Sequence, residues 1–200
     1  LMSIGVTSEV FIPYFLQHIP EVRPLTAGYM TALMSAGWTT GSILMSGRSW
    51  RFANRLLIIS PLLSALSLAV LGVLIPWQDL SLELGLTWVL YIPLFGVGLG
   101  VGMIWPHLST RVFLSTKAGQ ENMASAAITT LQMYAMSVGA ALAGLITTAA
   151  GFNTGTLDGV QRSASWLLFC FAWMPVIFVC ISKAARRAGA PQATSDQPKI

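Results

Sequence analysis

Charged residues are scarce in this 200-residue chain. Asp, Glu, Lys and Arg together make up 9% of it, against about 25% in an ordinary soluble domain. Hydrophobic residues make up 54%, and the mean hydropathy is +0.70. A soluble domain with so few charges would not cover its apolar side chains. The composition therefore excludes a soluble domain and indicates a membrane protein.

Cysteine and histidine are almost absent, with two residues of each type. Cys170 and Cys180 lie in one apolar stretch, and their spacing on a helix separates them by about 15 Å, which is too far for a disulfide. His18 and His107 are distant in the sequence, and no zinc-type spacing occurs. We predict no disulfide, no metal site and no cofactor.

Enzyme motifs and a leader sequence are also missing. The chain has no Gly-x-Ser-x-Gly motif, and no pair of aspartates falls within an apolar stretch. We therefore predict that the protein is not an enzyme. No basic segment precedes the first apolar stretch, so we predict no signal peptide and expect the chain to begin inside something larger.

Long apolar stretches dominate what is present. About 20 helical residues cross the roughly 30 Å core of a bilayer, and six stretches reach that length: 1–19, 25–46, 56–75, 86–113, 123–150 and 164–182. The sequence thus predicts an all-α membrane protein, with a six-helix transmembrane bundle over residues 1–182. Residues 183–200 are small and polar, which predicts a disordered cytoplasmic tail.

Lysine and arginine are unevenly distributed among the loops. If the six stretches alternate in direction, nine of the eleven cations fall on one side. Cytoplasmic loops retain an excess of these residues, so we predict that this side and both ends of the segment are cytoplasmic. The net charge of +4 therefore indicates membrane topology, and we expect no nucleic-acid partner.

The first stretch carries a glutamate among apolar residues. Glu9, Pro13 and Gln17 recur every fourth residue, so they share one helix face. A charged carboxylate in the bilayer centre costs about 3 kcal/mol or more, so Glu9 must protonate, find a partner or line a wet cavity. It is either a proton carrier or a permanently protonated acid that hydrogen-bonds to a neighbouring helix.

The fifth stretch carries a stripe of small and polar residues at three-four spacing. The stripe consists of Ser125, Thr129, Gln132, Met136, Gly139 and Ala143. Small residues let helices approach closely, so we expect Ser125, Gly139 and Ala143 to serve packing. The amide of Gln132 needs a partner in the membrane, and it either lines a substrate cavity or packs against another helix.

Glycine is concentrated in the fourth stretch. "GVGLGVGMIWPHL" contains Gly96, Gly98, Gly100, Gly102 and Pro106. Such a helix packs tightly and bends readily, so we predict that these residues serve a gate or helix packing. His107 is either a proton relay or an interfacial residue bonded to the backbone. Gly37 and Gly41 add a small-xxx-small contact in the second stretch.

Four stretches carry a family resemblance: "EVFIPYFLQHIPEVRPLTAGYMTAL", "GSILMSGRSWRFANRLLI", "GVGLGVGMIWPHLSTRVF" and "ENMASAAITTLQMYAMSVGAALAGLI". Together they resemble the C-terminal six-helix half of a major facilitator superfamily transporter of the multidrug:proton antiporter type. The second is similar to that family's cytoplasmic loop, in which basic residues follow a glycine. Gly47, Arg48, Arg51 and Arg55 match in kind, whereas the acidic residue is absent and Asn54 stands near the usual glycine.

The resemblance implies two three-helix repeats that form half of a transporter bundle in a bacterial inner (plasma) membrane. Glu9 would couple protons, with Pro13 and Gly139 at the gate or in helix packing. Gln17 and Gln132 would face the central cavity, with Tyr14 as an aromatic wall. Tyr134 either joins that wall or faces a neighbour or lipid, because it lies about 200° around the helix from Gln132.

The function implied is export of a small organic or drug-like compound in exchange for protons by alternating access. The implied partners are the lipid bilayer, the substrate, protons and either the missing N-terminal half or a second copy of the chain. The alternative is a noncatalytic membrane subunit or truncated remnant that packs against partner helices.

Overall fold

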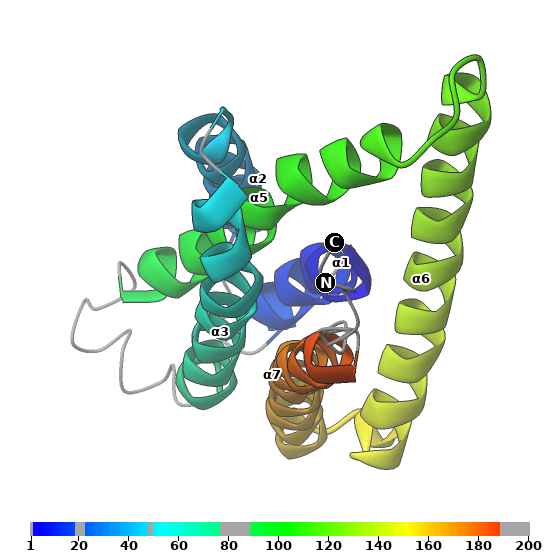
Figure 1. The fold of residues 1–200 in the computed structure, drawn as a ribbon. Helices are drawn as coiled ribbons and strands as arrows, with labels where there is room; N and C mark the ends of the chain where they lie inside the picture. The colour runs from blue at the N-terminus through cyan, green and yellow to red at the C-terminus, as the bar shows by residue number, and fades with distance from the viewer. Residues whose placement is uncertain (1, 19–22, 48–49, 77–88, 189–200) are drawn as a thin grey trace, which may run out of the picture.

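The computed structural model describes residues 2–18, 23–47, 50–76 and 89–188, with their side chains except those of residues 2–9, 50–51, 53–54, 178 and 182–188. These ranges form six long helices and a short 3-10 helix (Figure 1). They are α1 (Met2–His18), α2 (Pro24–Met45), α3 (Trp50–Leu74), α5 (Tyr91–Leu114), α6 (Glu121–Ala149), η2 (Phe152–Thr154) and α7 (Leu157–Ala188). No strand occurs in these ranges, which confirms the predicted all-α class.

Two helices extend beyond the predicted stretches. α3 begins at Trp50 rather than at residue 56, so the basic residues 51 and 55 are helical. α7 begins at Leu157 rather than at residue 164. The hydroxyl of the preceding residue, Thr156, accepts a hydrogen bond from the Gly159 amide at 3.2 Å and so caps the helix. α7 also continues to Ala188, past the predicted start of the tail at residue 183, because alanine, lysine and arginine favour the helix.

Four of the described helices are long and apolar enough to cross a membrane. These segments are Arg55–Leu74 in α3, Tyr91–Leu114 in α5, Glu121–Ala149 in α6 and Leu157–Ile181 in α7. α1 has 17 residues, and α2 contains several glycine, serine and threonine residues that lower its hydropathy. The predicted count of six spans is therefore not confirmed.

The helices pack around α1, which Figure 1 shows end-on near the centre of the bundle. α2 packs mainly along α5, α3 packs along both α5 and α7, and α6 packs mainly against α1. The largest apolar core joins all six long helices, and its buried members include Phe15, Leu16, Met34, Leu68, Leu71, Leu94, Leu167 and Phe171. α6 contributes only Ala143 to the buried part of this core, so α6 is the most loosely attached helix.

Glycines bring α2 and α5 into backbone contact. A Cβ on Gly98 would overlap the carbonyl oxygen of Met34, and a Cβ on Gly41 would lie 2.7 Å from the carbonyl oxygen of Leu99. Ordinary contacts of a Cβ atom are 3.4–4 Å. The two helices therefore lie closer than any residue with a side chain would allow at these positions.

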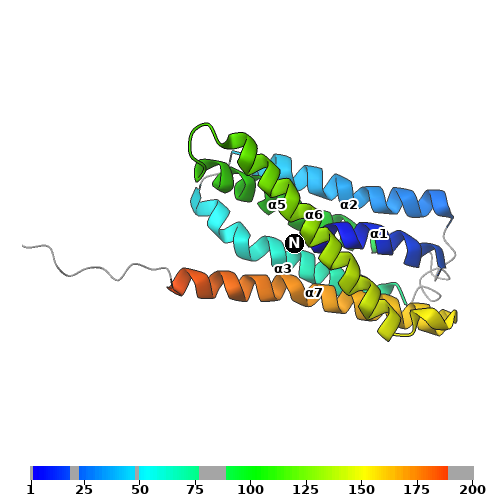
Figure 2. The same ribbon diagram turned by 90° about the vertical axis from the view of Figure 1, so that its right-hand side faces the viewer.

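The connections between helices lie at two opposite ends of the bundle. Figure 2 shows the α2–α3 and α5–α6 connections at one end, whereas the α6–α7 connection and the last turn of α1 lie at the other. Arg55, Arg111 and Lys117 belong to the first end. The basic residues of these two connections are thus gathered at one end, as alternating helices require.

Candidate functional site

The polar face of α1 is the first group of candidate residues. α1 is helical from Met2 to His18, so Glu9, Pro13 and Gln17 follow one another at intervals of about one turn on one face. Pro13 and Gln17 are partly buried. Pro13 has no backbone N–H, which leaves the carbonyl of Glu9 without its helical partner. The Glu9 side chain lies outside the described side chains, so its proton-coupling role stays a prediction.

An aromatic cluster joins the end of α1 to the α6–α7 connection. The ring of Tyr14 stacks on His18, with centroids 3.9 Å apart and planes at 16°. Its centroid also lies 5.3 Å from that of Phe152 in η2. His18 Nδ1 donates a hydrogen bond to the carbonyl oxygen of Tyr14 at 2.9 Å. Tyr14 was predicted as a cavity residue, whereas His18 and Phe152 were not. The four-residue spacing of Tyr14 and His18 is the only feature of the sequence that indicates this cluster.

The stripe on α6 lies partly on the side that faces the bundle. Gly139 and Ala143 are buried, and Gln132 is partly buried. Ser125 and Thr129 are exposed, and the Thr129 hydroxyl donates to the carbonyl of Ser125 at 3.1 Å, so it is satisfied within its own helix. The inward face therefore carries Gln132 as a polar group but excludes Ser125 and Thr129.

The predicted cavity residues do not all lie together. Tyr14 contacts Phe152, just beyond the end of α6, and Gln17 lies within a turn of Tyr14. Gln132 precedes the end of α6 by about 25 Å of helix. Tyr134 is 71% exposed and points away from the bundle. These side chains therefore occupy two depths, and only Tyr14 and Gln17 are close neighbours.

The glycine-rich part of α5 lies against two helices at once. Gly98 and Gly102 face the backbone of α2, while Gly96 and Gly100 face serines of α3. Pro106 has no N–H for the carbonyl of Gly102, which instead accepts a hydrogen bond from Ser42 Oγ of α2 at 3.2 Å. The bend site of α5 is thus tied to a neighbour, and its role as a gate stays a prediction.

The basic loop between α2 and α3 is described in part. Gly47 adopts a left-handed backbone conformation with φ of 74°, which explains glycine at this turn. Arg55 is exposed on α3. Arg48 lies outside the described residues, and the side chain of Arg51 lies outside the described side chains.

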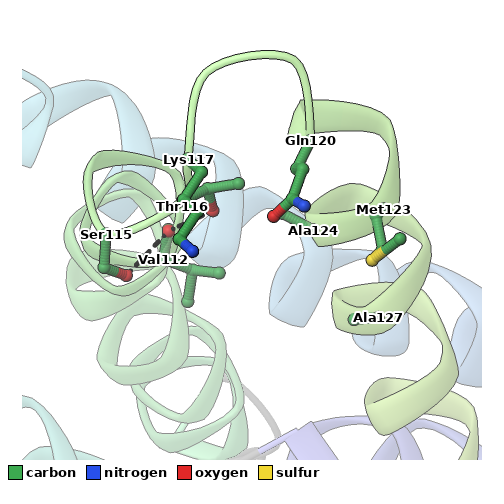
Figure 3. Close-up of a pocket in the computed structure, with 8 residues that line it drawn as sticks. All are labelled: Val112, Ser115, Thr116, Lys117, Gln120, Met123, Ala124 and Ala127. Atoms are coloured by element: carbon green, nitrogen blue, oxygen red, sulfur yellow. Dashed lines mark hydrogen bonds between the residues drawn. The ribbon is translucent and has the colours of Figure 1, made fainter.

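A recess of about 390 Å³ lies at the α5–α6 connection (Figure 3). Its lining residues are Val112, Ser115, Thr116, Lys117, Gln120, Met123, Ala124 and Ala127. The hydroxyls of Ser115 and Thr116 donate to the carbonyl of Val112 at 2.9 and 2.8 Å, so both hydroxyl protons already have an acceptor within the helix. The recess contains no predicted substrate residue and lies at the end of the bundle rather than in its centre.

Two proteins of Mycobacterium tuberculosis, from strains CDC 1551/Oshkosh and ATCC 25618/H37Rv, are similar to this chain. Each is named a probable multidrug-efflux transporter and is 30% identical over 166 residues. The match covers 82% of this chain but 35% of each relative, so the chain corresponds to about a third of their length. No protein-family profile matches the chain, and no solved structure matches it.

Proposed function

We propose that this chain is the C-terminal half of a major facilitator-type transporter that exports a small organic compound in exchange for protons. The observation that carries the proposal is its similarity, over most of its length, to part of two probable multidrug-efflux transporters. A chain that corresponds to a third of such a protein supplies one wall of a transport pathway. The second wall comes from an N-terminal half or from another copy of the chain.

The packing pattern supports two three-helix repeats. α2 packs on α5 and α6 packs on α1, while α3 packs on α5 and α7 packs on α1. α3 and α7 also pack on each other. If α1 is exchanged with α5, α2 with α6 and α3 with α7, the same set of packed helix pairs results. This symmetry is expected of the repeats from which such transporters are built.

The exposed side chains on the outer face of α6 support the proposal that a second half of the transporter packs there. Large apolar side chains on this helix are exposed in the described structure, among them Leu131 at 69%, Tyr134 at 71% and Leu145 at 68%. Lipid satisfies such a surface, but the exposed Ser125 beside it favours protein or water. We place the other half of the transporter against this helix.

Transport by alternating access needs binding free energy that differs between two states of the bundle. The glycine contacts fix α2 and α5 as one rigid unit, while α6 has few buried residues and moves at lower cost. Tyr14 and Gln17 lie at one end of this pathway and Gln132 lies much deeper. A substrate therefore meets them in succession, and protonation of Glu9 biases which end is open.

The test uses the complete parent protein in lipid vesicles with an imposed pH gradient. Export of a fluorescent lipophilic cation should follow the gradient, and Glu9→Gln should abolish that dependence because the amide carries no titratable proton. Glu121→Gln is the matched control, since Glu121 is exposed and its carboxylate bonds backbone amides beside it, among them that of Gly119 at 3.1 Å. Equal gradient dependence in both variants would exclude Glu9 from proton coupling.

The alternative, a noncatalytic subunit that packs against partner helices, predicts a different result. Such a protein would neither export any tested compound nor gain thermal stability from it. A ligand that binds the folded state raises the apparent Tm, so a substrate screen by thermal shift separates the two functions before any transport assay.

A further inference from the structure

Two polar atoms at the α3–α5 interface are buried without a hydrogen-bond partner in the part of the chain that the structure describes. They are Ser60 Oγ and His107 Nε2. Ser60 is 0% exposed, and His107 is partly buried. Buried polar side-chain atoms in native proteins nearly always bond to protein or to ordered water. Two such atoms in one interface indicate a shared partner.

The glycine contacts fix how α3 and α5 align. A Cβ on Gly96 would touch Ser67, whereas a Cβ on Gly100 would lie 3.0 Å from Ser64 N and 2.8 Å from the carbonyl oxygen of Ser60. Residue numbers therefore rise along α5 as they fall along α3. The two helices are antiparallel, so a residue about four positions later in α5 lies opposite a residue about four positions earlier in α3.

This alignment places His107 near Ser60. His107 follows Gly100 by about two turns, so it lies on the same face of α5, toward α3. The register brings it within about one turn of Leu57, which belongs to one buried cluster with Ile104 of α5. On a helix, each Cα–Cβ bond tilts toward the N-terminus. Because the helices are antiparallel, the side chains of Ser60 and His107 tilt toward each other.

Pro61 adds an acceptor at the same level. Proline has no N–H, so Pro61 in α3 leaves the carbonyl of Leu57 without its helical partner. α5 has the equivalent defect at Pro106, where Ser42 donates to the freed carbonyl of Gly102 at 3.2 Å. Ser60, less than one turn along α3 from Leu57, and His107 of α5 carry the polar atoms without a partner on the described part of this interface.

We propose that these three groups bind a single water molecule. The water accepts a hydrogen bond from the Ser60 hydroxyl and donates to the Leu57 carbonyl and to Nε2 of His107. Three hydrogen bonds are the usual number for a buried water. The proposal rests on the packing of α3 against α5 and does not depend on the transport function.

The surroundings of the site favour one trapped water rather than a channel. Leu56 and Ile104 are buried beside it, and Met103 and Leu108 pack against them. The water ties the proline site of α3 to α5, as Ser42 ties the proline site of α5 to α2. The freed carbonyls of Gly102 and Leu57 are thus each connected to a neighbouring helix, the first directly and the second through the water.

The experiment measures thermal unfolding of the full chain in detergent for Ser60→Ala, His107→Phe and the double variant. If the water is bound, Ser60→Ala removes a hydrogen bond from a satisfied site and lowers the Tm by about 2–4 °C. Both single changes empty the same site, so the double variant loses no more than the larger single loss. Ser137→Ala, at an exposed position of α6, is the control and leaves the Tm unchanged.

The opposite sign overturns the proposal. A hydroxyl that has no partner is costly in the folded state, so its removal by Ser60→Ala would then raise the Tm or leave it unchanged. Additive losses in the double variant would likewise exclude a shared water. A density map with a direct Ser60–His107 hydrogen bond and no water between them would replace the proposed site by a two-residue contact.

Discussion

Gly98→Ala adds one methyl group at the closest approach of α2 and α5. The new Cβ would overlap the carbonyl oxygen of Met34 and would lie 2.7 Å from its carbonyl carbon and 3.0 Å from the Trp38 nitrogen. All three are backbone atoms, so no side-chain rotation relieves the overlap. The helices must separate by on the order of 1 Å, which weakens the surrounding contacts as well.

Two effects of opposite sign set the magnitude. Overpacking of a well-packed interface costs about 1–3 kcal/mol, and rigid backbone neighbours place this site at the upper end. Alanine recovers up to about 1 kcal/mol because it favours the helix more than glycine does. The net loss is about 2 kcal/mol, which lowers the Tm of a chain of this size by about 4–8 °C.

The assay is thermal unfolding in detergent, followed by circular dichroism at helix wavelengths. Gly144→Ala is the matched control, because Gly144 lies inside α6 and a Cβ there meets nothing within 4 Å. That variant should be as stable as the unmodified protein or slightly more stable. If Gly98→Ala and Gly144→Ala gave the same Tm, the close approach of α2 and α5 would be wrong.

Three further substitutions test other parts of the structure. Ser163→Ala removes a fully buried hydroxyl that lies 2.7 and 3.1 Å from two carbonyl oxygens. It should lower the free energy of unfolding by about 1 kcal/mol, measured by thermal unfolding, and an unchanged Tm would contradict these bonds. Ser42→Ala leaves the Gly102 carbonyl unsatisfied and should cost about 1–2 kcal/mol, with recovery in Ser42→Thr. Tyr134→Ala should change the stability of this chain by less than about 0.5 kcal/mol, because the side chain is 71% exposed; a larger loss would place it in the core.

The positions of the helices were largely predictable, because each apolar stretch is long and bounded by polar residues. The helix ends were less predictable. α7 begins at a Thr156 cap that lies outside the apolar stretch, and residues 183–188 continue the helix through intrinsic propensity rather than through hydrophobicity. Composition locates the apolar part of a helix, whereas capping and propensity decide where its hydrogen bonds stop.

The candidate site was less predictable than the helices. Periodicity placed Glu9, Pro13 and Gln17 on one face, and the helical backbone of α1 has that spacing. It gave no means of placing Tyr14 beside Phe152, because that contact joins residues far apart in the chain. The inward face of α6 also excludes two residues of the predicted stripe, Ser125 and Thr129, since small residues mark close packing without fixing the rotation of the helix.

The sequence by itself determined the all-helical class and the apolar character of the chain, because both follow from local composition and from the hydrogen bonds of each segment. It also marked Gly37, Gly41 and the glycines of α5 as packing residues. Only the tertiary structure decided that these two sets meet, and that Pro61, Ser60 and His107 share one interface. Pairing between helices depends on which surfaces fit when all of them pack at once, and no single segment contains that information.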